Sequence, residues 1–270
     1  IAPGETVDAV LLSSDVDYFA ITTTKPEQYI VVDAQVENRE TIHAALYDAD
    51  GAQLGESIEV RAEGRYAFRT AGEGKYYLKF YPYSYRRSYS FTVTLIDNDA
   101  NEPNDTIETA APIAPGETVD AVLFADDVDY FAITTTKPSQ YVLVDARADG
   151  AKAYVGLRDA ADEPMGYCET VGGTTKRFMF YTAEAGTYYL RFSPYSTSVR
   201  SERAQVSFTF ALLDNDANEP NDTKETATAL HSGESTEFTL AGRDADYFKV
   251  TTTKPGQDIA LTVSGYNYAN

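Results

Sequence analysis

Residues 1–34 read IAPGETVDAVLLSSDVDYFAITTTKPEQYIVVDA, and residues 113–146 read IAPGETVDAVLFADDVDYFAITTTKPSQYVLVDA. The two stretches differ at six of 34 positions, and a more divergent third copy begins at Leu230. Other blocks recur in the same order, because DNDANEPNDT starts at both Asp97 and Asp214. The chain therefore repeats a unit of about 112–117 residues, which is the size of a domain and far longer than a solenoid repeat.

Within each copy, apolar side chains alternate with polar ones over short runs. The run from Tyr89 to Leu95 has period two, and the run from Val206 to Leu212 repeats it. Turn-forming Pro-Gly, Asp-Gly and Gly-Gly pairs separate such runs, and helix signals are scarce. About eight short strands per unit, each hydrophobic on one face, predict an all-β fold built as a two-sheet antiparallel sandwich.

The phase of the repeats predicts the domain boundaries. We expect a first copy at 1–99 that lacks its NEPND head, a complete second copy at 100–216, and a partial third copy at 217–270. Both ends then interrupt a repeat, as in an excerpt from a longer protein. Half a unit buries too little surface to stand alone, so the third copy should be loosely ordered or lean on the second.

Composition excludes several classes of protein. The chain has 42 Asp and Glu against 22 Lys and Arg, a net charge of −20, which repels the phosphates of nucleic acids and of anionic membranes. Its apolar runs are far shorter than the roughly 20 residues that cross a bilayer, so no membrane insertion is expected. One cysteine excludes a disulfide framework and a cysteine-based zinc site.

The stretch DNDANEPND at 97–105 concentrates oxygen atoms, and it recurs from Asp214. Carboxylate and amide oxygens are the ligands that Ca²⁺ requires, and the spacing imitates an EF-hand loop. A glutamate stands where that loop needs glycine, and no flanking helices are expected, so we discount the EF-hand interpretation. Asn and Asp also cap turns by accepting backbone N–H bonds, so a metal-free turn at a domain junction is the other interpretation.

The blocks EPND, DYF and GxYYLxF, in this order and at this spacing, resemble the bacterial pre-peptidase C-terminal domain family. The collagen-binding domains of clostridial collagenases are related to that family. The resemblance covers the second copy, most of the first and half of the third. It implies jelly-roll-like β-sandwiches in a secreted or cell-surface bacterial protein, usually without catalytic activity. Some members of the family bind calcium, and some bind protein fibres.

The resemblance also implies a calcium site where the EPND carboxylates meet an acidic pair before the DYF strand. In the second copy the matching residues are Glu102, Asn104, Asp105, Asp126 and Asp129. In the third copy they are Glu219, Asn221, Asp222 and Asp246. The chain departs from the family pattern at Ala100 and Ala217, and Arg243 stands at the position of Asp126 in the third copy, where a cation would oppose Ca²⁺.

Tyrosine is the aromatic residue that stands out, with 21 Tyr and no Trp in the chain. One hairpin concentrates tyrosines beside two arginines. A recognition face is one interpretation, with Tyr83, Tyr85 and Arg86 as its candidate contacts, because Tyr and Arg are typical of binding hot spots. Ordinary packing is the other interpretation, because tyrosine favours strands and can bury its ring while its hydroxyl stays in water.

The sequence contains no catalytic constellation that we can identify. His43 aligns with Tyr154 and His231 with Ala114, so neither histidine belongs to a repeated site. Cys168 has no repeated partner and is expected to be buried or half-buried.

We therefore expect a non-catalytic extracellular module that serves as a spacer and binding domain. Its expected partners are the neighbouring domains of a longer chain and an extracellular protein or polysaccharide. The alternatives are an adhesion module for a protein fibre or polysaccharide, and an accessory targeting domain of a secreted peptidase.

Overall fold

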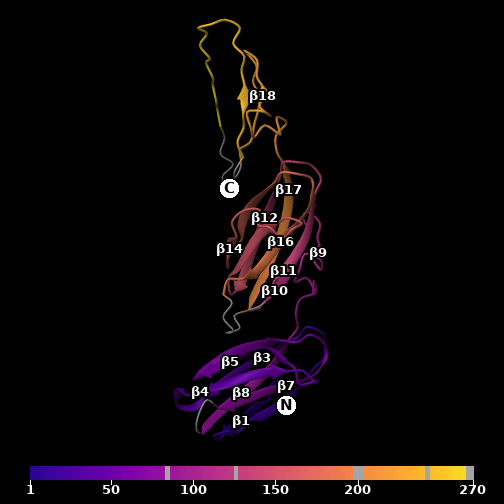
Figure 1. The fold of residues 1–270 in the computed structure, drawn as a ribbon, viewed down its shortest axis with the longest axis vertical. Helices are drawn as coiled ribbons and strands as arrows, with labels where there is room; N and C mark the ends of the chain where they lie inside the picture. The colour runs from indigo at the N-terminus through magenta and orange to yellow at the C-terminus, as the bar shows by residue number, and fades with distance from the viewer. Residues whose placement is uncertain (83–85, 125–126, 197–202, 241–243, 266–270) are drawn as a thin grey trace. The chain divides into compact units, whose positions relative to one another are not determined.

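The computed structural model describes residues 1–82, 86–124, 127–196, 203–240 and 244–265. The chain divides into two compact units, Ile1–Leu213 and Asp214–Asn270. The first unit holds two β-sandwiches, one from each of the first two sequence copies (Figure 1). In the described part of the chain the regular structure is strand apart from one short 3-10 turn, η1 (Glu37–Arg39), so the all-β prediction is confirmed.

The first sandwich consists of eight strands. They are β1 (Thr6–Leu11), β2 (Asp17–Thr23), β3 (Tyr29–Val36), β4 (Thr41–Tyr47), β5 (Gln53–Arg61), β6 (Glu63–Arg69), β7 (Gly74–Pro82) and β8 (Arg87–Ile96). One sheet has the order β1-β8-β3-β6 and the other the order β2-β7-β4-β5, with antiparallel pairing throughout. Two four-stranded sheets connected in this order form a jelly roll, as predicted.

The second sandwich repeats this topology with one short addition. Its strands are β9 (Ala111–Pro112), β10 (Val119–Leu123), β11 (Asp129–Thr135), β12 (Gln140–Gly150), β13 (Ala153–Arg158), β14 (Glu169–Val171), β15 (Lys176–Thr182), β16 (Gly186–Pro194) and β17 (Ala204–Asp214). The sheets have the orders β10-β17-β12-β15 and β14-β13-β16-β11-β9. The added strand β9 pairs in parallel with β11 at the sheet edge.

Each sandwich buries the apolar face of its strands between its two sheets. In β8, Tyr89, Phe91 and Val93 are at most 3% exposed, as the period-two pattern predicts. The ring of Phe91 packs against that of Phe80, with centroids 4.8 Å apart. The second core repeats this contact between the rings of Phe192 and Phe208, at 4.5 Å.

Cys168 corrects one expectation from the sequence. It is a free, exposed cysteine, neither buried nor half-buried as predicted. It lies just before β14, a three-residue strand at the edge of its sheet. A side chain beside a short edge strand is covered by neighbours on one side only, which leaves this thiol in contact with solvent.

The second unit contains the third copy and little regular structure. Strands β18 (Thr228–Ala229) and β19 (Phe248–Lys249) pair in parallel over two residues each. Leu240, Leu261 and Val263 are 60–70% exposed, so the half copy does not bury the apolar residues that fill the core of a complete sandwich. No helix among the described residues is long and apolar enough to span a membrane.

Two glycines of the second sandwich provide a matched test of its turn geometry. Gly116 and Gly150 both have φ of +82°, but a Cβ at Gly150 would lie 2.4 Å from the Arg203 carbonyl oxygen, whereas one at Gly116 meets nothing within 4 Å. We expect Gly116→Ala to lower the free energy of unfolding by about 1–2 kcal/mol, the cost of the left-handed backbone. Gly150→Ala should cost more because the backbone must also move. Urea unfolding measures both, and equal losses would contradict this geometry.

Candidate functional site at the acidic junction

The segment that follows β8 folds into a turn held by its own side chains. Asp99 accepts hydrogen bonds from the backbone N–H of Asn101 at Oδ1 (2.9 Å) and of Val122 at Oδ2 (2.7 Å). Glu102 accepts one at Oε2 from the Asn104 N–H (3.0 Å). Both Asp99 oxygens are thus used in holding the backbone of a turn, which is the local bonding that Asp provides in turns.

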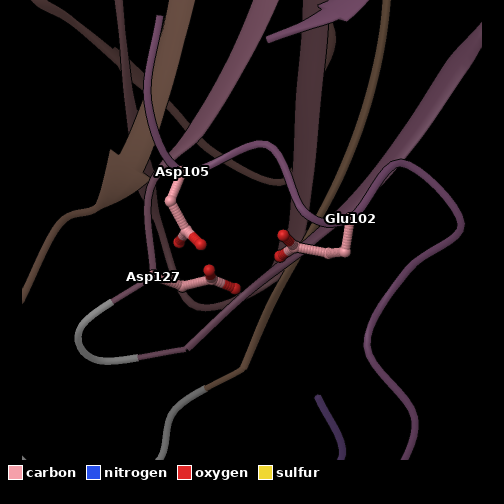
Figure 2. Close-up of side chains that lie close together, drawn as sticks. All are labelled: Glu102, Asp105 and Asp127. Carbon is pink, nitrogen blue, oxygen red and sulfur yellow. The ribbon is translucent and has the colours of Figure 1, made fainter. Parts of the chain in front are cut away.

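Three carboxyl groups meet beside this turn. Glu102 and Asp105 come from the turn, and Asp127 comes from the connection between β10 and β11 (Figure 2). One oxygen from each lies within 4.8 Å of the others. Asp127 is fully buried and the Glu102 side chain is 5% exposed. Carboxylates this close and this poorly solvated repel one another unless a cation lies among them.

Arg69 supplies that cation from the first sandwich. It is the last residue of β6, and its guanidinium donates to Asp105 at both oxygens, over 2.5 and 2.8 Å. It also lies 3.4 Å from Glu102 Oε2 and 3.5 Å from Asp127 Oδ1. Burial opposes its charge, but the Asp105 hydrogen bond and the surrounding carboxylates outweigh burial and raise the pKa of Arg69. The guanidinium therefore joins two domains through an ion pair that is largely shielded from water.

Two further buried groups complete the second-copy cluster. Asn104 is fully buried, and with its amide nitrogen facing the carboxylates it donates to Glu102 Oε2 (3.2 Å) and Asp129 Oδ1 (3.1 Å). Burial, with repulsion from Asp127 next, raises the pKa of Asp129 well above its usual value. Burial also raises the pKa of Asp127, to about 8, with repulsion from Glu102 adding to it and Arg69 acting against it.

A small apolar cluster lies at the same junction. Tyr29 and Val31 from β3 of the first sandwich are buried with Val122 and Phe124 of the second. The rings of Tyr29 and Phe124 are 4.0 Å apart between centroids. The junction thus combines buried apolar contact with charge pairing.

The third copy repeats the turn and the acidic cluster. Asp216 accepts from the N–H of Asn218 (2.9 Å) and of Thr239 (2.7 Å), as Asp99 does in the second copy. Glu219 belongs to two sets of three carboxyl groups whose oxygens lie within 4.8 Å of one another. One set contains Asp216 and Asp246, and the other contains Asp222 and Asp244. Burial is the main cause that raises the pKa of Glu219 and of Asp246.

Asn221 distinguishes the third cluster from the second. Its side chain is fully buried and lies against Asp246, but its amide atoms make no hydrogen bond of full geometry in the described part of the chain. Both side-chain oxygens of Asp246 are also buried without a hydrogen bond. Buried polar atoms of this kind are normally satisfied by a partner, water or an ion.

The two clusters differ in their fit to calcium. Both offer the hard oxygen ligands that Ca²⁺ prefers. In the second copy the Arg69 guanidinium already lies among the carboxylates, so the residues do not fit an additional cation. In the third copy Asn221, Asp246 and Glu219 fit a calcium ion, which would satisfy the buried amide and carboxylate oxygens.

The structure brings together most of the residues that the sequence singled out for the second cluster. Glu102, Asn104, Asp105 and Asp129 lie together. Asp126 and Arg243 lie outside the described residues, as do Tyr83 and Tyr85 of the candidate recognition hairpin. Arg86, the third member of that hairpin set, is exposed.

Sequence reasoning missed Arg69, Asp127 and Asp244. A signal for the two aspartates was present, because all three copies carry Asp at this position, as Asp15, Asp127 and Asp244. The preceding position, which was chosen instead, varies among Ser, Asp and Arg. Arg69 had no such signal, since the equivalent residue of the second copy is Tyr181.

The fold and this site define a tandem array of jelly-roll sandwiches with an acidic turn at the start of the second and third copies. No protein-family model matches the chain, and no curated protein matches it. Among solved structures, tripeptidyl peptidase 2 is 11% identical over 82% of this chain, with a TM-score of 0.30, and the chain spans only 23% of its length.

Two other solved structures are similar at the same low level. The PBSX exported protein XepA is 10% identical over 77% of this chain and 87% of its own, with a TM-score of 0.24. The CUB1-EGF-CUB2 region of human MASP-1/3 is 7% identical over 76% and 99%, with a TM-score of 0.23. Scores of this size do not establish a shared fold, so nothing is carried over from these proteins.

The raised pKa of Asp127 predicts a pH dependence of stability. Its carboxyl keeps a proton up to about pH 8 when folded and loses it near pH 4 when unfolded. Between these values the folded state binds more protons, so stability falls as pH rises. Relative to Asp127→Asn, wild type should lose up to about 1.4 kcal/mol per pH unit in urea unfolding. A difference that stays flat from pH 4 to pH 8 would contradict the raised pKa.

Proposed function

We propose that this chain is a non-catalytic spacer and binding segment of a secreted or cell-surface bacterial protein, built from tandem jelly-roll domains. One observation carries the spacer role. The first two sandwiches are joined by the Arg69 guanidinium, which is half-buried among Asp105, Glu102 and Asp127. A shielded ion pair of this kind constrains two domains far more than a flexible linker does. The proposed consequence is a stiff pair of domains that holds its neighbours apart.

The apolar cluster supports the same role. Contacts between domains of one chain are usually small and polar, so relative motion is the default expectation. Here Tyr29 and Phe124 are each at most 1% exposed and their rings are in contact. Burying two aromatic rings adds stabilisation that separation of the domains would lose.

The next pair of copies differs at three of these positions and retains others, since Tyr29 and Asp105 recur as Tyr141 and Asp222. In the sequence, Tyr181 replaces Arg69, while Thr239 and Ala241 replace Val122 and Phe124. The cation and the apolar partners on the second copy's side of the first joint are therefore not repeated in sequence. We propose that the Arg69 joint is specific to the first pair of copies.

Two arginines on the same strand provide a matched test of the joint. The Arg65 guanidinium also forms a bidentate ion pair, with the carboxylate of Asp33, but the Arg65 side chain is 61% exposed. Arg69→Ala should lower the free energy of unfolding by about 3 kcal/mol or more, because it leaves buried carboxylates without their cation. Arg65→Ala should cost less than about 1 kcal/mol.

The readouts are urea unfolding and small-angle X-ray scattering of the full chain. The scattering should show a broader distribution of distances for Arg69→Ala and no change for Arg65→Ala. Identical scattering from the two variants and wild type would refute the stiff joint, whatever the loss of stability.

Calcium binding by the third copy is a second candidate function. The observation that favours it is the fully buried Asn221 amide, which makes no hydrogen bond of full geometry and lies against the buried oxygens of Asp246. Glu219 lies against the same group. The second copy should not respond to calcium, because Arg69 already supplies the positive charge there.

Isothermal titration of calcium into chelator-treated protein tests this difference. Wild type should bind one ion, and Asp246→Asn should weaken that binding at least about tenfold by removing a charged ligand. Arg69→Met should gain a second, weaker ion because it vacates the second cluster, whereas Arg65→Met should not. A titration of wild type that shows no heat of calcium binding would exclude the third-copy site.

A further inference from the structure

A group of aromatic rings surrounds one lysine on the outer face of the first sandwich. This tyrosine–lysine patch consists of Tyr18, His43, Tyr47, Lys79 and Tyr81. The Lys79 ammonium lies 5.8, 5.6 and 5.1 Å from the ring centroids of Tyr18, Tyr47 and Tyr81. The His43 ring stacks on Tyr81 at 5.0 Å.

The patch lies on three neighbouring strands, β2, β7 and β4. Register explains why it forms. Tyr18 pairs with Lys79 across β2 and β7, and His43 pairs with Tyr81 across β7 and β4, so these side chains project from the same face. Tyr18 is 56% exposed, which makes its ring available to a ligand. The opposite faces of these strands fill the core.

The charge of this face is opposite to that of the chain. The outward positions of β2, β7 and β4 lie entirely within the described chain, and they carry Lys75 and Lys79 but no carboxylate. On the adjacent strand β5, Glu56 and Glu59 are exposed, and Glu59 is paired with Arg61. In a chain with a net charge of −20, a face of positive sign is a local departure. Such a face attracts anionic ligands, and screening beyond about 8 Å at physiological salt weakens the repulsion from the remaining surface.

The second sandwich does not repeat the patch. Arg191 occupies the position of Lys79, but Tyr130, the counterpart of Tyr18, is only 6% exposed. Asp162 accepts a hydrogen bond from the Tyr130 hydroxyl and so places a negative charge beside the hydroxyl of that ring. Arg158 replaces Tyr47 at the equivalent position. The two copies share a scaffold, but the first gathers three tyrosine rings around Lys79, whereas in the second Lys152 lies over the single exposed ring of Tyr195, at 5.6 Å.

We propose that the tyrosine–lysine patch binds an acidic polysaccharide, with sugar rings packed on the tyrosine faces and a sugar carboxylate paired with Lys79. The inference rests on the binding role proposed above and names a ligand class for it. Tyrosine provides a flat, rigid and amphipathic surface at low entropic cost, which suits the C–H face of a sugar ring. The ammonium provides a charge-assisted bond to a carboxylate beside that ring.

An acidic peptide fits the patch less well. A peptide recognised by a sheet adds a strand at an edge, where backbone groups are free. The patch is instead centred on β7, which is hydrogen-bonded on both sides, to β2 and to β4, and only Tyr18 lies on an edge strand, β2. A flexible peptide would also lose more conformational freedom on a flat surface than a stiff sugar chain would.

The test measures binding of the full chain to polygalacturonate, a uronic-acid polymer, by biolayer interferometry with chelator present and about 0.15 M salt. Methyl-esterified polygalacturonate supplies the same rings without the charge, and polyglutamate supplies the charge without the rings. Lys79→Gln and Tyr18→Ala remove the two elements of the patch. Arg65→Gln is the matched control, because it removes one positive charge from the other sheet of the same sandwich.

Wild type should bind polygalacturonate and should bind the esterified polymer and polyglutamate more weakly. Lys79→Gln should weaken binding by roughly twofold to fivefold, the range of an exposed ion pair. Tyr18→Ala should weaken it too, while Tyr18→Phe and Arg65→Gln should match wild type. Equal binding to polyglutamate would assign the patch to acidic peptides. Three outcomes would overturn the proposal. They are equal binding to polyglutamate, equal losses of affinity in Lys79→Gln and Arg65→Gln, and no binding of polygalacturonate by folded wild type.

The scattering test of the joint is independent of these outcomes. A chain with an intact Arg69 joint that ignores polygalacturonate would refute the ligand class and leave the spacer role in place. A chain that binds the polymer but shows no stiff joint would refute the spacer role and leave the ligand class in place.

Discussion

One guanidinium determines how the first two domains of this chain meet. Asp127 and Glu102 are almost completely shielded from water and lie within a few ångströms of Asp105. Carboxylates in that environment either take up protons or require a cation, because desolvation and mutual repulsion both disfavour their charge. Both occur here, because Asp127 keeps a proton up to about pH 8 while Arg69, from the neighbouring domain, provides the cation for Asp105. The charge balance of the second domain is therefore complete only when the first domain is in place.

Sequence periodicity was sufficient for the fold and insufficient for this contact. Alternation in runs such as Tyr89 to Leu95 fixes which face of a strand is buried, and the buried face then requires a second sheet. The turn at Asp99 was also predictable, because its bonds are local in sequence. Arg69 was not, since it lies 36 residues from Asp105 and 58 from Asp127 along the chain. Nothing in an arginine that ends a strand reveals a partner so distant in sequence.

The copies diverge where they face something other than their own core. The aromatic contact between Phe80 and Phe91 is repeated by Phe192 and Phe208. Arg69 and Lys79, in contrast, correspond to Tyr181 and Arg191. Interior positions are constrained by close packing, so repeats retain them. Surface positions are free of that constraint, and one scaffold can therefore carry a joint in one place and an exposed aromatic face in another.

Near-identity of adjacent copies has a consequence for synthesis. The segment VDAVL occurs in β1 and again as the whole of β10, and each pairs with the last long strand of its own sandwich, β8 or β17. Either segment offers the same backbone and side chains to either partner, so strands could be exchanged between neighbours while both are unfolded. Synthesis on the ribosome removes this ambiguity, because β8 leaves the exit tunnel before β10 does. Strand β8 can therefore pair with β1 and complete the first sandwich before the competing strand is available. Refolding of the whole chain from denaturant lacks that order, and interchange of these strands is the characteristic error it would produce.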